Sequence, residues 1–152
     1  MAKRSPQLQR LEEVLHSSKL VSGGFMGSDN ISVLDVIDAD LAELSQLDIT
    51  AERIAARMQE ITDIAKAGLG NWVKIDENRQ AMTEEAKGSL VCPWPHPGKF
   101  AKRVTTVKLN KSGQTIRWSD LNIHQIAEHS FFEGKSSAFR IEPKKMMKII
   151  FG

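Results

Sequence analysis

The chain has 152 residues and a mass of 17.0 kDa, and 41% of its residues are hydrophobic and 26% charged. This composition is typical of one globular domain and excludes a disordered or fibrous protein. The single cysteine excludes an internal disulfide, and no apolar run approaches the roughly 20 residues of a membrane span. The first residues also lack the apolar core of a signal peptide, so we expect a cytoplasmic protein without a membrane segment.

Three helices are expected in the first half of the chain. The first opens at Ser5 and Pro6, a capping side chain followed by a residue that needs no N–H at the first helical position, and ends near Lys19. A loop over residues 22–30 separates it from a second helix over about 32–47, and Thr50 caps the third. Apolar residues recur at helical spacing in each: Leu8, Leu11 and Leu15; Leu34, Ile37, Leu41 and Leu44; Ile54, Met58, Ile61 and Ala65.

Short extended segments follow the third helix. Residues 71–76 have the β-branched content of a strand, residues 83–86 are expected to form a helical turn, and residues 90–92 are extended. Three prolines exclude a helix between Cys92 and Gly98. Two longer strands over 100–109 and 114–118 are joined by a four-residue turn, which predicts a hairpin.

A helix from Ser119 or Asp120 to about His129 comes next, then a loop over 134–137, a strand over 138–142 and a last helix that opens at Pro143. The fold class is therefore α+β: N-terminal helices followed by a small, mostly antiparallel sheet with a crossing helix. We expect one domain over residues 1–152, helical over about 1–70 and sheet-containing over about 71–152.

The charge is divided unevenly along the chain. Residues 1–90 contain ten Lys or Arg and fifteen Asp or Glu, a net −5, whereas residues 91–152 contain eleven and four, a net +7. The basic residues of the hairpin could attract an anionic small molecule or nucleic acid, with Phe100 and Trp118 nearby. The alternatives are an ordinary solvated sheet face and a homo-oligomer in which the acidic half of one subunit meets the basic half of another. The hairpin cations are Lys99, Lys102, Arg103, Lys108, Lys111 and Arg117.

The types and spacings of four side chains suit a zinc site. Cys92 and His96 are separated by three residues, and His124 and His129 by four. At 100° per residue the last two lie about 140° apart around a helix, so both reach one ion only if the helix ends or bends before His129. The alternative is a structural thiol with unrelated histidines.

A second arrangement suits acid–base chemistry. His124 and Glu128 are four residues apart on one helical face, where the carboxylate could orient the imidazole, although any surface helix can carry such a pair. The helix end, glycine loop and strand between His124 and Arg140 are the expected place for a pocket. The ligand or partner residues expected beside it are Trp94, Arg117, Glu133 and Arg140.

Two functions from different classes follow. The first is a small cytoplasmic binding or interaction protein, an oligomer whose ligand or partner site lies in the basic C-terminal half. The alternative is a metal-dependent protein or enzyme that uses the Cys/His set, with zinc as its cofactor, or the His124–Glu128 pair.

Overall fold

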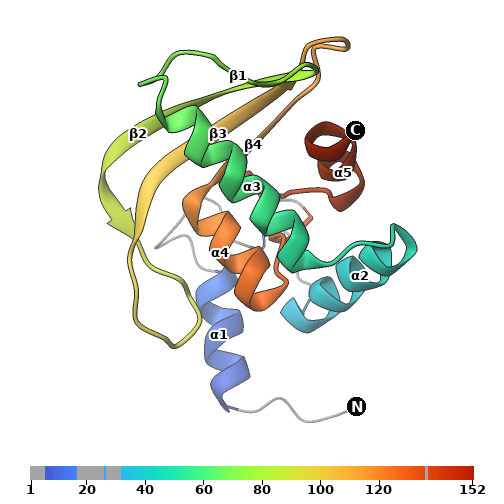
Figure 1. Ribbon diagram of the computed structural model, residues 1–152. Coiled ribbons are helices and arrows are strands. Elements are labelled where there is room, and N and C mark those ends of the chain that lie inside the picture. Colours follow the sequence, from blue (N-terminus) through green and yellow to red (C-terminus); the bar gives the residue numbers. More distant parts are fainter. Residues whose placement is uncertain (1–5, 17–25, 27–31, 136) are drawn as a thin grey trace.

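A computed structural model describes residues 6–16, 26, 32–135 and 137–152 (Figure 1). The predicted cap at Ser5 and all of the predicted loop over 22–30 except Met26 lie outside the described residues. The described part is α+β as expected, with helices before a four-stranded antiparallel sheet and a helix packed across it. The elements are α1 (Pro6–His16), α2 (Val33–Gln46), α3 (Ala51–Lys66), β1 (Val73–Asp76), β2 (Arg79–Leu90), β3 (Phe100–Leu109), β4 (Thr115–Ser119), α4 (Asp120–His129) and α5 (Pro143–Phe151).

The sheet has the simple order β1-β2-β3-β4, and every neighbouring pair is antiparallel. The predicted β3–β4 hairpin is confirmed, and the Gly113 N–H closes its turn by donating to the Leu109 carbonyl at 2.8 Å. The helical turn predicted over 83–86 is wrong, because these residues continue β2. Thr83 pairs with Thr105 of β3, so the ladder supplies the backbone hydrogen bonds that a helical turn would otherwise make.

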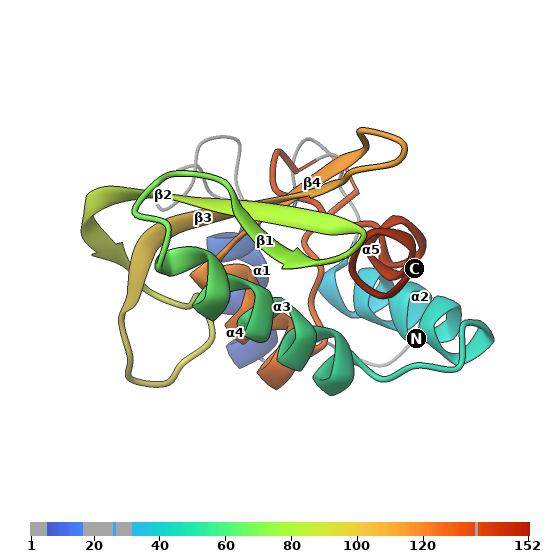
Figure 2. The ribbon, with the colours of Figure 1, turned by 45° about the horizontal axis from the view of Figure 1, so that its top comes forward.

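The helices α3 and α4 lie against one face of the sheet (Figure 2). The predicted apolar face of α3 is confirmed, since Ile54, Met58, Ile61 and Ala65 are all fully buried. Between this helix and the sheet, the Trp118 indole N–H donates to the Thr62 hydroxyl at 2.9 Å. That hydroxyl lies 2.9 Å from the Thr105 hydroxyl, so a short polar chain crosses the core with its hydrogen bonds made.

Replacing Trp118 with Phe tests this chain. The variant loses the indole donor and part of a fully buried ring, and we expect the free energy of unfolding to fall by about 2 kcal/mol in urea denaturation. Thr62→Val in the same background should then cost less than it does alone, since its partner is already missing. If Thr62→Val lowers the free energy of unfolding equally in both backgrounds, the hydrogen bond between Trp118 and Thr62 does not contribute to stability.

The helix α2 forms as predicted, but its buried face only partly matches the predicted one. Leu34 and Leu41 were expected in the apolar stripe and are 49% and 41% exposed. Of that stripe, Leu44 is buried and Ile37 packs partly buried against a second, smaller core. The other buried residues are Val33, Val36 and Asp40. Asp40 can face the interior because it forms an ion pair with Arg140, and a buried carboxylate needs such a partner.

The segment before α5 is irregular, and the strand predicted over 138–142 is wrong. The Ile141 N–H donates to the Phe132 carbonyl at 3.1 Å, and the Arg140 side chain turns inward, so no ladder forms. The last helix opens at Pro143 as predicted and buries Ile149 and Ile150. No helix in the described ranges has the length and apolar character needed to span a membrane.

A second, smaller core lies beside the main one and contains the only cysteine. Cys92 is 7% exposed and packs with residues from α1, α2, α4 and the segment after α4. Its buried members are Leu15, Met26, Val33, Val36, Cys92, Leu121 and Phe131. The N-terminal helices thus cover the place where the β2–β3 loop approaches α4.

Candidate metal centre

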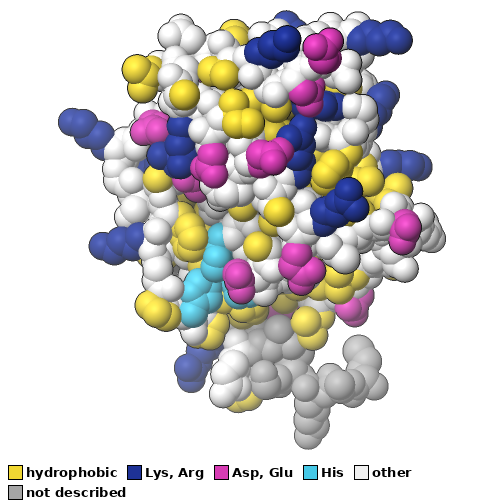
Figure 3. All heavy atoms as spheres, viewed as in Figure 1, with side chains coloured by type: hydrophobic (Ala, Val, Ile, Leu, Met, Phe, Trp, Pro, Cys, Tyr) yellow, Lys and Arg dark blue, Asp and Glu magenta, His cyan; other side chains and the backbone are white. Residues whose placement is uncertain are grey.

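The structure brings the four predicted metal ligands together. Cys92 and His96 lie in the loop between β2 and β3, and His124 and His129 lie on α4. One ligand atom of each lies within 4.8 Å of the others. Histidine side chains gather at one place on the surface of the molecule (Figure 3). Four side chains of this kind could hold a metal ion.

The local structure of α4 explains how both of its histidines reach one point. Ser119 and Asn122 form a capping box that fixes the start of the helix. His129 is its last residue, and Ser130 follows in the left-handed conformation at φ 52° and ψ 33°. A helical side chain leans toward the helix N-terminus, so the His129 imidazole lies over the preceding turn, with its ring centre 5.2 Å from that of His124. The 140° separation around the helix does not keep the two rings apart.

Three of the distances between ligand atoms are close to metal-site spacing, and all four atoms lie within 4.8 Å of one another. His96 Nε2 is 3.0 Å from His124 Nε2 and 3.2 Å from His129 Nε2, and Cys92 Sγ is 3.4 Å from His129 Nε2. Bonds of 2.0–2.3 Å to a tetrahedral zinc ion place ligand atoms roughly 3.3–3.8 Å apart. Side-chain shifts of up to roughly 1 Å would bring the most distant atoms to this spacing.

The hydrogen bonding of His96 favours a metal ion at the centre. His96 Nδ1 lies 2.9 Å from the Pro97 carbonyl, which can only accept, so Nδ1 carries the proton. In the neutral ring, Nε2 then presents its lone pair to the other two Nε2 atoms. In one tautomer the other two Nε2 atoms donate to this lone pair, and in the other tautomer a metal ion can bind all three nitrogens. An imidazole N–H bonded to a carbonyl is also the usual support of a metal-bound histidine.

Aromatic side chains fix the orientation of the imidazoles. Trp94 stacks on His129 with ring centres 4.1 Å apart, and its edge faces Phe131 at 5.3 Å. Phe100 covers His124 at 4.4 Å. Trp94 was expected to contact a ligand or partner, and the structure places it against a candidate metal ligand.

The sequence analysis assigned no role at this site to two supporting groups, the Pro97 carbonyl and the Phe100 ring. Pro97 directly follows His96, and Phe100 opens β3 just beyond the loop. Their closeness in sequence to His96 was the available signal for a supporting role. The sequence alone does not show which imidazole the carbonyl or the ring contacts.

Burial favours the neutral form, which binds metals, in the imidazoles of His124 and His129. It lowers the pKa of His129 to about 4, and the neighbouring His124 and His96 act in the same direction. Burial also lowers the pKa of His124, with a further contribution from His96. The pKa of the Cys92 thiol is raised by burial, although a hydrogen bond from the Trp94 N–H opposes this. A bound divalent cation would supply the positive charge that the thiolate needs.

The His124–Glu128 pair is not aligned for acid–base chemistry in this structure. No hydrogen bond joins the two side chains in the part of the chain that the structure describes, and His124 Nε2 faces His96 instead. The exposed Glu128 raises the pKa of His124, but less than burial lowers it. The catalytic role of the pair stays a prediction.

The other expected ligand residues lie away from the Cys/His cluster and do not meet at one site. Arg117 is exposed on β4, with its guanidinium 5.0 Å from the centre of the Phe139 ring. Glu133 is 3% exposed. Arg140 donates to the Glu133 carbonyl and binds Asp40, so these two residues belong to a network inside the protein. Of the expected ligand residues, Trp94 alone touches the Cys/His cluster.

Glu133 makes the stability of the protein dependent on pH. Asn122 and Ser137 donate to its carboxylate, yet burial raises its pKa from the ordinary 4.5 to about 7. The folded protein therefore binds this proton more tightly than the unfolded chain, so the stability due to the protonated side chain is lost as the pH rises through 7.

In Glu133→Gln this part of the pH dependence disappears, and we expect the variant to gain up to about 3 kcal/mol relative to the parent between pH 5 and pH 8.5. Urea denaturation at both pH values measures it, and a difference between the two proteins that does not change with pH would contradict the raised pKa.

Some of the unevenly distributed charges of the two halves form ion pairs within the chain. Arg103 of the basic half binds Glu85 at 2.8 Å and Asp120 at 2.6 Å, and Arg140 binds Asp40 of the acidic half. Trp118 is fully buried. The hairpin residues named from the sequence therefore do not form one continuous basic patch.

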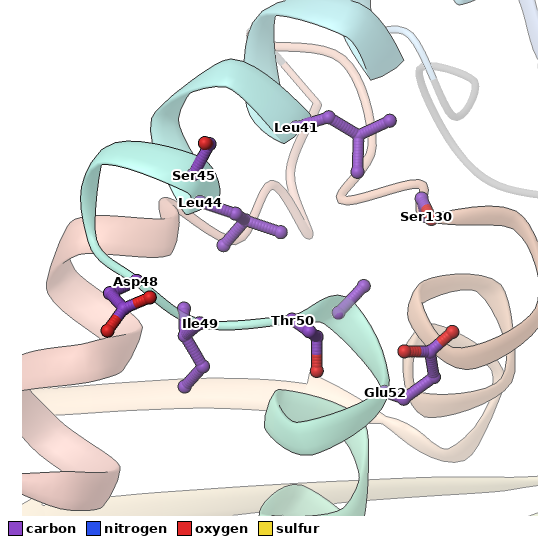
Figure 4. A pocket seen from close by; sticks show the side chains of 9 residues that line it. Leu41, Leu44, Ser45, Asp48, Ile49, Thr50, Glu52 and Ser130 are labelled. Atoms are coloured by element: carbon purple, nitrogen blue, oxygen red, sulfur yellow. The ribbon is translucent and has the colours of Figure 1, made fainter.

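A shallow hollow of about 450 Å³ lies between the end of α2 and the start of α3 (Figure 4). Leucine and isoleucine side chains line it together with the carboxylates of Asp48 and Glu52. Among the described residues that line it, the polar side chains are these two carboxylates and the hydroxyls of serine and threonine. None of them belongs to the Cys/His cluster.

Comparison of the chain with protein families, with curated proteins and with solved structures finds no significant match. The fold and the site alone define the class, an α+β protein with a Cys/His₃ cluster that could hold a metal ion.

Proposed function

We propose that this protein binds one zinc ion through Cys92, His96, His124 and His129, and that the ion has a structural role. The observation that carries the proposal is the approach of four ligand atoms, from a loop and a helix, to within 4.8 Å of one another. One thiolate and three imidazoles form a ligand set that suits Zn²⁺, which prefers four nitrogen and sulfur ligands in a tetrahedron.

The number of ligands supports a structural rather than a catalytic ion. Catalytic zinc sites keep one position open for water, whereas here the protein supplies all four ligands. The ion would join the β2–β3 loop to the last turns of α4, two segments that meet at the smaller core. We infer that the protein acts by binding a partner, and that the metal holds the binding-competent shape of the C-terminal half.

Two further expectations belong to this proposal. A single cysteine used as a metal ligand suits a reducing compartment, which supports a cytoplasmic location. The exposed Leu34 and Leu41, seven residues apart on α2, would suit contact with a second copy of the chain.

Metal analysis tests the zinc site. Untagged protein, purified without chelator, is expected to contain about one zinc ion per chain. His129→Ala and Cys92→Ala should each lose most of the metal, whereas Lys99→Ala, an exposed change in the same loop, should keep it. Less than about one tenth of a zinc or iron ion per chain, even after incubation with excess Zn²⁺ and desalting, would overturn the proposal.

A further inference from the structure

The helices α3, α4 and α5 pack on one face of the sheet and leave the other face free of these helices. The side chains of Thr105 and Trp118 point toward α3, so their neighbours in the strands point away from it. Pairing between strands places Lys74 beside Gln80 and Gln80 beside Lys108 on this outer face. Arg117 lies on the same face, opposite Thr106. Three cations therefore cross the sheet from β1 to β4.

A hollow of about 480 Å³ lies beside two of these cations, Lys74 and Lys108. The described residues that line it are Lys74, Arg79, Gln80, Lys108 and Asn110, which are three cations and two amides and include no carboxylate. Arg79 is held by Asp76 and by carbonyls at the end of α5, so its charge is already paired. The two lysines have no ion pair within the described residues, and their ammonium groups are available to an anion.

Aromatic rings accompany two of the cations. Lys108 Nζ lies 5.8 Å from the centre of the Trp72 ring, and the Trp72 side chain is 44% exposed. Arg117 lies 5.0 Å from the centre of the Phe139 ring. Where a cation lies beside an exposed ring, the cation can bind a phosphate and the ring can stack on the flat face of a base.

We propose that this outer face binds single-stranded nucleic acid, with phosphates on Lys74, Lys108 and Arg117 and a base stacked on Trp72. Neighbouring strands are about 4.8 Å apart, so consecutive cations lie roughly 8–10 Å from each other across the sheet. This spacing extends over more than one nucleotide and favours a chain of phosphates over a free nucleotide. A duplex hides the faces of its bases, so it cannot use Trp72.

Fluorescence anisotropy with a labelled single-stranded 12-nucleotide oligomer of mixed sequence tests the proposal on metal-loaded, full-length protein. The oligomer is expected to bind with an affinity that falls as salt rises, with a logarithmic slope of about −2 for three phosphate contacts. Lys74→Glu/Lys108→Glu should weaken binding at least about tenfold. Trp72→Ala should weaken it about tenfold with little change in the salt slope.

Lys144→Glu/Lys145→Glu is the matched control, because it changes the net charge equally at two exposed positions on α5. It should weaken binding less than about threefold. No binding at low salt, equal losses in the two double variants, or a duplex of the same length bound as tightly as the single strand would each overturn the proposal. A free nucleotide is also added as a competitor. If it displaces the labelled oligomer as effectively, per phosphate, as unlabelled oligomer does, the ligand is a nucleotide and the proposal is overturned. Thermal unfolding of each variant shows that it is folded at the temperature of the assay.

Discussion

Metal removal is expected to lower the midpoint of thermal unfolding by about 10 °C. An ion that binds only the folded protein stabilises it by about 4 kcal/mol when its free concentration is a thousand times its dissociation constant. In a domain of this size each kcal/mol shifts the midpoint by roughly 2–4 °C. Part of the fold should survive, because the main core between α3 and the sheet contains none of the four ligands. Differential scanning calorimetry with and without EDTA, followed by addition of Zn²⁺, measures the shift and its reversal.

Cys92→Ala provides the control for this experiment. The variant should already unfold at the lowered midpoint, and EDTA should change it little, since the site has lost a ligand. In Lys99→Ala, EDTA should lower the midpoint as in the parent. A parent protein whose midpoint is the same with and without EDTA, although it had contained zinc, would show that the ion does not support the fold.

Replacing Asp40 with Ala is expected to lower the free energy of unfolding by about 3 kcal/mol. Both carboxylate oxygens accept from the Arg140 guanidinium, at 2.5 and 2.7 Å, and the two side chains are 2% and 5% exposed. Removing one partner of such a pair leaves a buried charge without compensation, a loss of about 3–5 kcal/mol. Glu142, which also binds Arg140 but is half-exposed, keeps the expected loss at the lower end of this range. Urea denaturation measures the change.

Two comparisons identify the cause of this loss. Asp40→Leu combined with Arg140→Met removes both charges and should be clearly more stable than Asp40→Ala. Glu60→Ala breaks the ion pair with Arg57, in which Glu60 is 58% exposed, and should cost less than about 1 kcal/mol. If Asp40→Ala costs no more than Glu60→Ala, the buried pair does not hold α2 in place.

The elements that could be predicted from the sequence are those with a local signal. The helix α3 has a capping Thr50 and an uninterrupted apolar stripe, and the β3–β4 hairpin has alternating residues around a glycine turn. The second half of β2 has no such signal, since six consecutive residues from Glu84 are exposed. It is a strand because it pairs with β3, and this pairing joins residues far apart in sequence. The orientation of α2 likewise depends on Arg140, one hundred residues beyond Asp40.

The composition of the candidate metal centre could be predicted, but its geometry could not. Ligand types and spacing identified Cys92 and His96 as one pair and His124 and His129 as another. Angular separation on an ideal helix argued against convergence, because that calculation omits the direction in which side chains lean and the place where the helix ends. Glu133 and Arg140 were selected for their charge, and only the fold shows that their side chains point inward.

The strand β2 is longer than its neighbour β1, which pairs with it only from Arg79 to Ala81. Beyond that point one edge of β2 meets no other strand in the described part of the chain, and such an edge can recruit a strand from another molecule. Here it carries Glu84, Glu85 and Lys87, and an irregularity between Ala86 and Ser89 interrupts its hydrogen-bonding pattern. Charges and bulges of this kind oppose the addition of further strands. The edge is therefore protected against aggregation, and a homo-oligomer of this chain would have to form through another surface.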